Sequence, residues 1–300
     1  MSIVLNIINN YSVSENMVEN ANTCRENPKK VKLHEPRIRS GIGYFGEAAF
    51  QLWKDLINIL AIVGEISEAV YYAVKNPRKI RWRETLYYMD VCGADALPIS
   101  CLICFLMGLI LGFQGAIQMH KFGTDLYVAD LVGLSIVKEL GPLMVAMICT
   151  GRAGSAFAAE ISTMKVSEEI DAMITMGFIP SRFLIIPKLL ALVLVMPILT
   201  VFGNVMGIIG GMTVGVFSLG LPVISYFNRT VLVVTPRFFT EGLVKSAVFA
   251  VLIAAVGCLR GMEANNDTHG VGRAATSAVV SGIFLVIVAD TLMTYLFSKL

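Results

Sequence analysis

The chain has 300 residues, of which 56% are hydrophobic and only 15% are charged, and its mean hydropathy is +0.71. Soluble domains carry about 25% charged residues, so the composition excludes an ordinary soluble protein and indicates a polytopic membrane protein. The formal net charge of +2 gives no support to nucleic-acid binding, and we expect none.

The first part of the chain is polar and ends in a membrane-surface segment. Residues 1–40 predict a disordered cytoplasmic tail with a basic end, without the features of a cleavable signal peptide. Residues 42–74 follow a helical period, but Lys54 and Glu65 interrupt it too often for a membrane span. This pattern predicts an amphipathic helix lying in the membrane interface. The basic cluster that follows, residues 75–83, favours the cytoplasmic side.

Long uncharged runs predict five membrane spans in residues 41–300, since about 20 residues cross the hydrocarbon. The predicted spans are about 96–119, 131–151, 189–216, 240–260 and 276–298. The third run continues past residue 216 into an apolar outer loop. The fold class is therefore all-α integral membrane, with the interfacial helix, five spans and a short cytoplasmic helix between spans two and three.

The distribution of Lys and Arg predicts the topology. With the N-terminus in the cytoplasm, the cytoplasmic parts hold 18 Lys and Arg and the outer parts hold four. The positive-inside rule therefore predicts a cytoplasmic N-terminus and a periplasmic C-terminus.

Residues 167–177 form a short acidic segment that this topology places in the cytoplasm. Ser167 is expected to act as an N-cap, with Glu168, Glu169 and Asp171 in the first turn, where carboxylates favour the helix dipole. The segment is either a docking helix for a soluble partner or an ordinary solvated helix, and the pattern leaves both interpretations open.

Ionisable residues within predicted spans are costly and suggest a function. Lys138, Glu139, Lys245 and Asp290 fall at similar outer depths, and Gln114 lies at a comparable one. They predict a polar rim around a cavity open to the periplasm; the alternative is snorkelling with structural ion pairs. Adjacent residues on a helix point about 100° apart, so Lys138 and Glu139 need partners other than each other.

Four glycines at four-residue spacing in span three allow close helix packing, within the chain or across a dimer: Gly203, Gly207, Gly211 and Gly215. The chain contains no phosphate-binding loop, zinc-protease motif or nucleophile elbow. Its three histidines are far apart and suggest no metal site. We therefore expect no catalytic residues, no metal and no cofactor bound by this chain itself.

Several motifs together resemble the MlaE-type permease family, the membrane subunits of ABC systems that work with MCE-domain proteins. They are KELGPL (138–143), GRAGSAFAAEISTMKVSEEIDAM (151–173), MGFIPSRFLIIPKLLA (176–191), LVKSAVFA (243–250) and GVGRAATSAVV (270–280). The resemblance covers roughly residues 42–298. Where this chain has Lys138, some relatives have Arg, which binds phosphate in a bidentate manner that Lys cannot reproduce.

The resemblance implies a homodimer bound to two cytoplasmic ATPase subunits, which carry the ATP and Mg, and to a periplasmic MCE ring. It implies phospholipid or a related lipid as cargo, held in a cavity between the two copies. The expected location is the inner membrane of a double-membraned bacterium, with a role in outer-membrane lipid asymmetry.

The resulting site prediction has two parts. The predicted substrate-cavity residues are Gln114, Lys138, Glu139, Leu140, Lys245 and Asp290. The residues expected to couple to the ATPase are Arg152, Glu160, Lys165, Glu168, Glu169, Asp171, Met173 and Gly177. Two other functions stay open: an ion-coupled secondary carrier using the intramembrane charges, and a non-transporting scaffold whose buried charges are structural.

Overall fold

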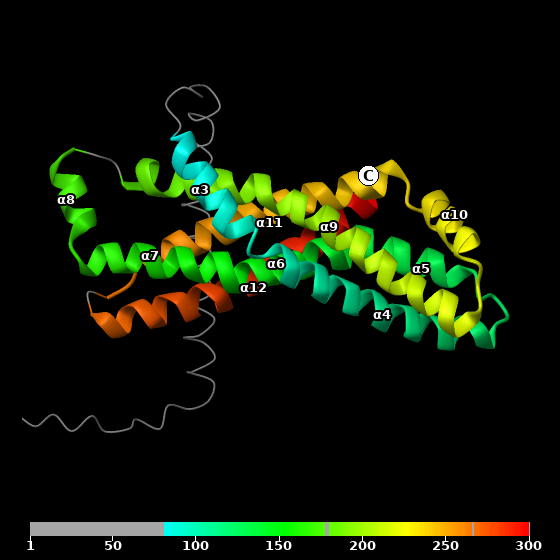
Figure 1. The fold of residues 1–300 in the computed structure, drawn as a ribbon. Coiled ribbons are helices and arrows are strands. Elements are labelled where there is room, and N and C mark those ends of the chain that lie inside the picture. Colours follow the sequence, from blue (N-terminus) through cyan, green and yellow to red (C-terminus); the bar gives the residue numbers. More distant parts are fainter. Residues whose placement is uncertain (1–80, 178–179, 266, 300) are drawn as a thin grey trace, which may run out of the picture. The chain divides into compact units, whose positions relative to one another are not determined.

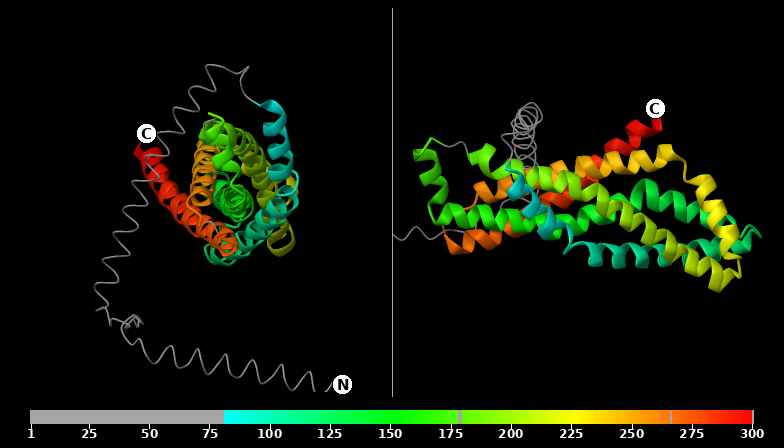
Figure 2. Two further views of the ribbon diagram at one scale, coloured as in Figure 1. Left: turned by 90° about the vertical axis from the view of Figure 1, so that its left-hand side faces the viewer. Right: turned by 45° about the horizontal axis from the view of Figure 1, so that its top comes forward.

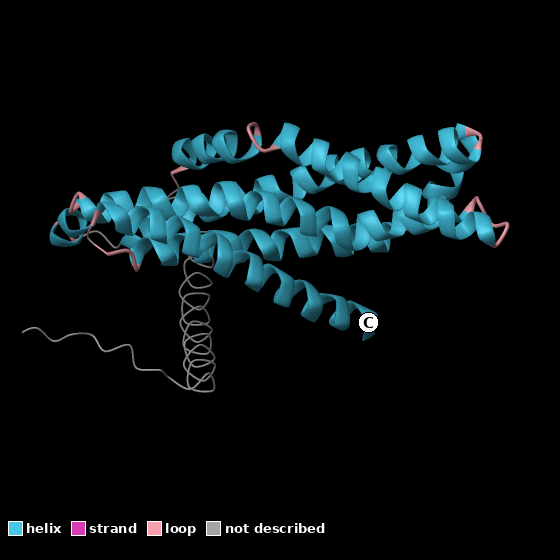
Figure 3. Ribbon diagram, turned by 90° about the horizontal axis from the view of Figure 1, so that it is seen from below, coloured by secondary structure: helices cyan, strands magenta, loops and turns pink. Residues whose placement is uncertain are grey.

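The computed structural model describes residues 81–177, 180–265 and 267–299, all within the unit Asp55–Leu300. The predicted tail (1–40) and interfacial helix (42–74) lie outside the described residues. The described part consists of helices and connecting loops, with no strand (Figure 1, Figure 3). In chain order the elements are α3 (Trp82–Gly93), α4 (Leu97–Lys121), α5 (Tyr127–Ser135), η2 (Ile136–Leu140), α6 (Gly141–Cys149), η3 (Thr150–Gly154), α7 (Ser155–Val166), α8 (Glu169–Thr175), η4 (Ser181–Ile185), α9 (Ile186–Leu219), α10 (Val223–Val233), α11 (Pro236–Met262) and α12 (Thr268–Lys299).

Five helical stretches are long and apolar enough to cross a membrane, which confirms the predicted number of spans. They are Trp82–Lys121, Tyr127–Val166, Phe183–Leu219, Pro236–Met262 and His269–Lys299. Each extends beyond the range predicted from uncharged runs, because the helices continue past their first charged residues. α8 lies at one end of the bundle and α10 at the other (Figure 1); we call these the α8 end and the α10 end.

The second span is a continuous helix at the centre of the bundle. An end-on view shows it surrounded by α3, α4, α9, α11 and α12 (Figure 2). Two π-helical segments, η2 and η3, interrupt its α-helical course. Such segments are rare and often occur at functional sites. Lys138 and Glu139 lie in η2, and Arg152 lies in η3.

The glycine-rich face of α9 packs within the chain, largely against α4. A Cβ atom on Gly108 would lie 1.9 Å from the carbonyl oxygen of Gly207, and one on Gly203 would lie 2.9 Å from a thiol sulfur of α4. Cβ atoms on Gly211 and Gly215 would meet side chains of α5 and α10 at 2.4 and 2.9 Å. Only residues without a side chain allow these backbones to approach so closely.

The main apolar core lies where α6, α7, α9 and α11 meet. Its fully buried side chains include Val145, Phe157, Leu192, Phe249 and Ile253. α11 is the most buried of the five spans, and α12 is the least buried. The apolar side chains on the outer faces of α4 and α12 are therefore available to lipid or to another protein chain.

The short helix α8 differs from its prediction at its start. Ser167 is not its N-cap: Ser167 ends α7, and its hydroxyl donates to the carbonyl oxygen of Thr163 at 3.0 Å. A serine hydroxyl readily bonds the carbonyl one turn back in its own helix. The N-cap residue is Glu168, whose φ of 61° lies in the left-handed region and turns the chain between α7 and α8 (Figure 1).

The predicted outer loop after span three contains a further helix, α10. Tyr226 and Thr230, four residues apart, are buried against neighbouring helices, while Ile224 and Phe227 are exposed. The segment is therefore amphipathic, with one face packed on the bundle, which a search for uncharged runs does not detect.

Candidate functional site

Three of the predicted intramembrane charges meet in one cluster between η2, α11 and α12. The ammonium of Lys245, whose side chain is fully buried, donates to Glu139 and to Asp290 Oδ1, the latter at 2.9 Å. It also donates to Thr294 Oγ1 at 2.7 Å. We call Glu139, Lys245, Asp290 and Thr294 the Lys245 cluster. All three donor hydrogens of its ammonium have acceptors, so this cation is saturated.

Thr294 is a member of this cluster that the sequence reasoning missed. Its hydroxyl accepts from Lys245 and lies 3.2 Å from Glu139 Oε2, to which it donates. Thr294 follows Asp290 by four residues, so the two side chains share one face of α12. That spacing is the signal that could have identified it.

Gly242 allows two of the helical segments that carry the Lys245 cluster to pack closely. A Cβ on Gly242 would lie 2.4 Å from the carbonyl oxygen of Val137, so only glycine allows α11 to approach η2 at this point. Gly242 precedes Lys245 by three residues, on the same helix face. The close approach therefore positions the Lys245 ammonium opposite Glu139.

Lys138 has a different partner. Its ammonium lies 3.8 Å from Glu241 Oε2, and Glu241 also accepts from Arg237 Nε at 3.2 Å. The same ammonium lies 5.5 Å from the centre of the Phe238 ring. Glu241 precedes Lys245 by one helical turn, so neighbouring residues of η2 pair with neighbouring turns of α11. Glu241 was also missed: it lies at the start of predicted span four (240–260), where the sequence analysis considered only Lys245.

The two remaining predicted cavity residues are placed differently. Leu140 is half-buried at the end of η2, next to Glu139. Gln114 has an exposed side chain on α4, which packs mainly against α5, α6 and α9. Gln114 therefore lies on a different side of the bundle from the helices that carry Lys245 and Asp290.

Two Arg–Asp pairs bracket the apolar part of the bundle. At the α10 end, Arg229 Nη2 lies 2.6 Å from Asp130 Oδ2, and this hydrogen bonding raises the pKa of the Arg229 guanidinium above its ordinary value. At the α8 end, Arg152 Nη2 lies 2.6 Å from Asp95 Oδ2. At about 1.5 Å per residue, Asp130 and Arg152 are about 33 Å apart along span two, close to the hydrocarbon thickness of about 30 Å.

The depth of the Lys245 cluster can be measured along span two from the Arg–Asp pair at the α10 end. Glu139 lies about 14 Å from Asp130 along the helix, which is near the middle of the apolar region. This is somewhat deeper than the outer position expected from the sequence. The exposed fraction of the Glu139 side chain is 30%, so the cluster is accessible on one side.

The predicted coupling residues lie toward the α8 end but in different surroundings. Glu168, Glu169 and Asp171 are exposed at the start of α8. Met173 packs against the main core. Gly177, just after α8, has a φ of +80°, a conformation that glycine adopts without strain.

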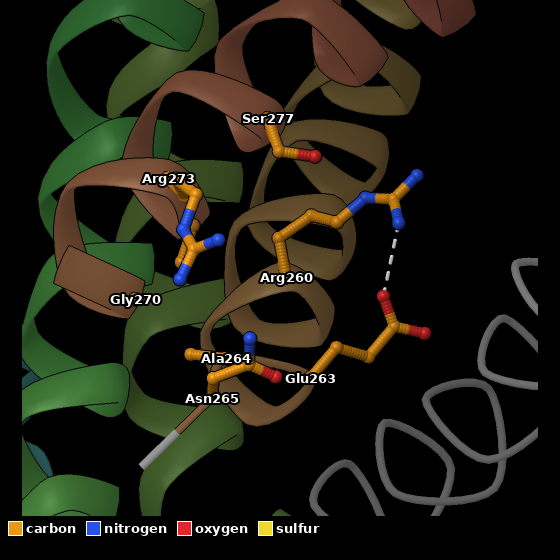
Figure 4. Close-up of a pocket in the computed structure, with 8 residues that line it drawn as sticks. Arg260, Glu263, Ala264, Asn265, Gly270, Arg273 and Ser277 are labelled. Carbon is orange, nitrogen blue, oxygen red and sulfur yellow. Dashed lines mark hydrogen bonds and ion pairs between the residues drawn. The ribbon is translucent and has the colours of Figure 1, made fainter. Parts of the chain in front are cut away.

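Lys165 ties α7 to the turn between α11 and α12. Its ammonium donates to the carbonyl oxygens of Met262 at 2.7 Å and Ala264 at 2.9 Å. A cation at the last carbonyls of α11 also favours the negative end of that helix dipole. The same turn borders a pocket of about 210 Å³, where Arg260 pairs with Glu263 at 2.9 Å (Figure 4).

A second ion pair, with a buried lysine and a partly exposed glutamate, joins α9 to α7. Lys188, whose side chain is fully buried, lies 2.9 Å from Glu160 Oε2, and the Tyr88 hydroxyl donates to Glu160 Oε1 at 2.6 Å. The Lys188 ammonium also lies 5.2 Å from the Tyr88 ring centre. Glu160 on α7 thus contacts both α3 and α9 through its side chain. The sequence predicts this residue to couple to the ATPase. The sequence reasoning missed Lys188 because it stands at the edge of the uncharged run.

No group of His, Cys, Asp and Glu side chains that could hold a metal ion occurs in the part of the chain that the structure describes. The buried lysines of the described part pair with carboxylates from neighbouring helices. Such an arrangement can hold helices in register and present a partly exposed cation.

The matches to known proteins cover most of the helical bundle. The family model described as "Permease MlaE" matches residues 85–296. A probable ABC transporter permease protein of Rickettsia conorii is 36% identical over 207 residues, which is 69% of this chain and 80% of the relative. The intermembrane phospholipid transport system permease protein MlaE of Haemophilus influenzae is 30% identical over 246 residues, 81% of this chain and 94% of the relative.

A relative from another lineage is more distant. The chloroplast protein TRIGALACTOSYLDIACYLGLYCEROL 1 of Arabidopsis thaliana is 28% identical over 219 residues, 73% of this chain and 63% of the relative. The family model spans every described element from within α3 to the last turns of α12, including the whole Lys245 cluster. The chain therefore belongs to the MlaE family of ABC transporter permeases.

Proposed function

We propose that this chain is the permease subunit of an ABC transporter that moves phospholipid or a related lipid between the inner membrane and a periplasmic MCE-domain protein. A separate ATPase subunit drives the transport. The H. influenzae relative is named for intermembrane phospholipid transport, and its match over 81% of this chain supports a cargo of the same class.

The observation that carries the proposal is the contrast between two neighbouring cations. Lys245 is buried and saturated, whereas Lys138 is 25% exposed and its distance to Glu241 is 3.8 Å, too long for a hydrogen bond. Lys138 therefore has donor hydrogens available for an anion. A lysine ammonium binds phosphate as a point charge, so we assign Lys138 to the lipid phosphate and the Lys245 cluster to holding η2 in place.

The α8 end has the features that coupling to an ATPase requires. The exposed carboxylates of α8 form a charged docking surface, and Lys165 connects the preceding helix to the end of α11. A movement of α8 would thus be transmitted to α7, whose continuous helix contains Glu139 and Lys138. Allosteric transitions of this kind shift packed, rigid elements relative to one another.

A homodimer completes the proposal. α12 is the least buried span and bears exposed apolar residues, among them Phe284, Ile287 and Leu292. A second copy packed on this side would enclose the accessible face of Glu139 and form an apolar cavity for acyl chains. Such a cavity needs few polar groups, because the headgroup is the only charged part of the lipid.

The experiment that tests this function is the purification of the tagged protein from native membranes in mild detergent, with mass spectrometry of its proteins and lipids. We expect an ABC ATPase, an MCE-domain protein and phospholipid. The Lys138→Met variant should retain the protein partners and lose at least half of the phospholipid, while Lys138→Arg, which keeps the charge, should retain it.

A further variant separates the two sites. Glu168→Lys combined with Glu169→Lys should lose the ATPase and leave the spans inserted. A lone chain without ATPase, isolated from cells that produce its neighbours normally, would contradict the proposal and favour the ion-coupled carrier. Unchanged phospholipid in Lys138→Met would contradict the role of Lys138.

A further inference from the structure

A cavity of about 170 Å³ opens between α3 and α7 at the α8 end, well separated from the Lys245 cluster. One wall is formed by Arg152, Ala156 and Glu160, and the opposite wall by Tyr87 and Tyr88. A water molecule occupies about 30 Å³ in the liquid, so the cavity has room for a polar group much larger than one water.

The cavity presents one positive and one negative group on the same wall. Arg152 and Glu160 are eight residues apart, about 12 Å along the helix. They bind different partners, Asp95 and Lys188 respectively, and not each other. By contrast, Arg260 and Glu263 in the pocket of Figure 4 pair with each other.

Both groups keep hydrogen-bonding capacity for a ligand. The Arg152 side chain is 38% exposed and the Glu160 side chain is 41% exposed. A guanidinium has five N–H donors and a carboxylate has about four acceptor positions, and their protein partners use only part of these.

The depth of the cavity matches a lipid headgroup. The Arg152–Asp95 pair lies at the boundary of the apolar region, and Glu160 lies two helical turns beyond it. Trp82 and Tyr87 on α3 are exposed at this level, and such residues are enriched at the membrane–water interface. Leu86 and Val91, also exposed on α3, provide an apolar surface beside the cavity.

We propose that this cavity binds the headgroup of a zwitterionic phospholipid with a primary ammonium, taken from the leaflet at the α8 end. The phosphate binds Arg152, and the ammonium donates to Glu160. A phosphatidylglycerol headgroup has no cation to pair with Glu160, and a choline headgroup has no N–H to donate. The inference rests on the proposed function in one respect only, that the chain handles phospholipid.

The test is to count bound lipids by native mass spectrometry after reconstitution in nanodiscs of phosphatidylethanolamine, phosphatidylcholine and phosphatidylglycerol in equal amounts. Ala156 lines the cavity and is exposed on α7, so Ala156→Leu fills the space without removing a charge or hydrogen bond. We expect this variant to lose about one phosphatidylethanolamine per chain. The matched control Ala156→Ser, which leaves the space open, should keep it.

A second variant distinguishes this site from the transport site. Lys138→Met should keep the phosphatidylethanolamine that Ala156→Leu loses, whatever its effect on transport. Equal phosphatidylethanolamine counts in Ala156→Leu and Ala156→Ser would overturn the inference. Loss of phosphatidylglycerol in place of phosphatidylethanolamine would also overturn it, because the site would then select an anion.

Discussion

Lys245 is the residue on which the centre of the bundle depends. One ammonium bridges two carboxylates in a region where an unpaired charge costs several kcal/mol. Its three acceptors come from two different helices, η2 within span two and α12. Lys245 therefore links three of the five spans through a single side chain.

Replacing Lys245 by Met should destabilise the protein by about 3–5 kcal/mol, because Glu139 and Asp290 would stay within the apolar part of the bundle without their cation. The triple variant Glu139→Gln, Lys245→Met, Asp290→Asn should regain most of this loss, since no unpaired charge is left. Unfolding in a detergent titration measures both. A single variant as stable as the original protein, or a triple variant as unstable as the single one, would contradict this account.

The sequence identified the three charged members of the Lys245 cluster and missed its uncharged member, Thr294. Glu139, Lys245 and Asp290 are recognisable because a charge within an apolar run needs a reason to be there. Thr294 is not recognisable in this way, since a hydroxyl in a helix can donate a hydrogen bond to the carbonyl oxygen one turn back in the same helix. Its part in the cluster depends on how α12 is rotated against η2, which only the packed structure specifies.

At the scale of elements, α4 and α9 are held by backbone-to-backbone contact. The Gly108–Gly207 crossing leaves no room for a methyl group, so the two helices approach more closely than side chains would permit. Dispersion between closely packed surfaces is the main attraction between helices within a membrane, where lipid is as apolar as the core.

Gly108→Ala should therefore lower the unfolding free energy by about 1–3 kcal/mol through overpacking. Gly272→Ala is the matched control: Gly272 also lies in a helix, but a Cβ there meets no atom within 4 Å. We expect no loss in that variant, because alanine favours helices. Thermal unfolding in one detergent compares the two, and equal midpoints would argue against close backbone contact at Gly108.

The number and order of the membrane spans could be predicted from the sequence, but the ends of the spans and the additional helix α10 could not. Approximate span positions follow from apolar runs. α10 is an amphipathic helix whose buried face consists of Tyr226 and Thr230, and two residues are too few for the sequence pattern to indicate an amphipathic helix. The start of α8 likewise depends on the left-handed turn at Glu168, a conformation that its residue type does not announce.

At the scale of the whole molecule, the distribution of Lys and Arg predicts that the α8 end faces the cytoplasm and the α10 end the periplasm. Thr175 on α8 and Ser225 on α10 are both exposed. Single cysteines at these positions, in a Cys24→Ala background, report the topology because the five other native cysteines are buried.

A membrane-impermeant maleimide added to intact spheroplasts should label Ser225→Cys and leave Thr175→Cys unlabelled until the membrane is opened. The two labels serve as each other's control for reactivity. The reverse pattern would invert the topology and place α8 out of reach of any cytoplasmic ATPase.

The two Arg–Asp pairs also make the molecule sensitive to bilayer thickness. Isolated arginines can snorkel toward water when a membrane thickens, but Arg152 and Arg229 are each held by a carboxylate from a distant part of the chain. The bilayer must then adjust to the protein, at a cost of fractions of a kcal/mol for each Å of mismatch. The acyl-chain length of the surrounding lipids thus affects the spacing between the two ends of the bundle. Through that spacing it also affects how a movement of α8 is transmitted to Lys138.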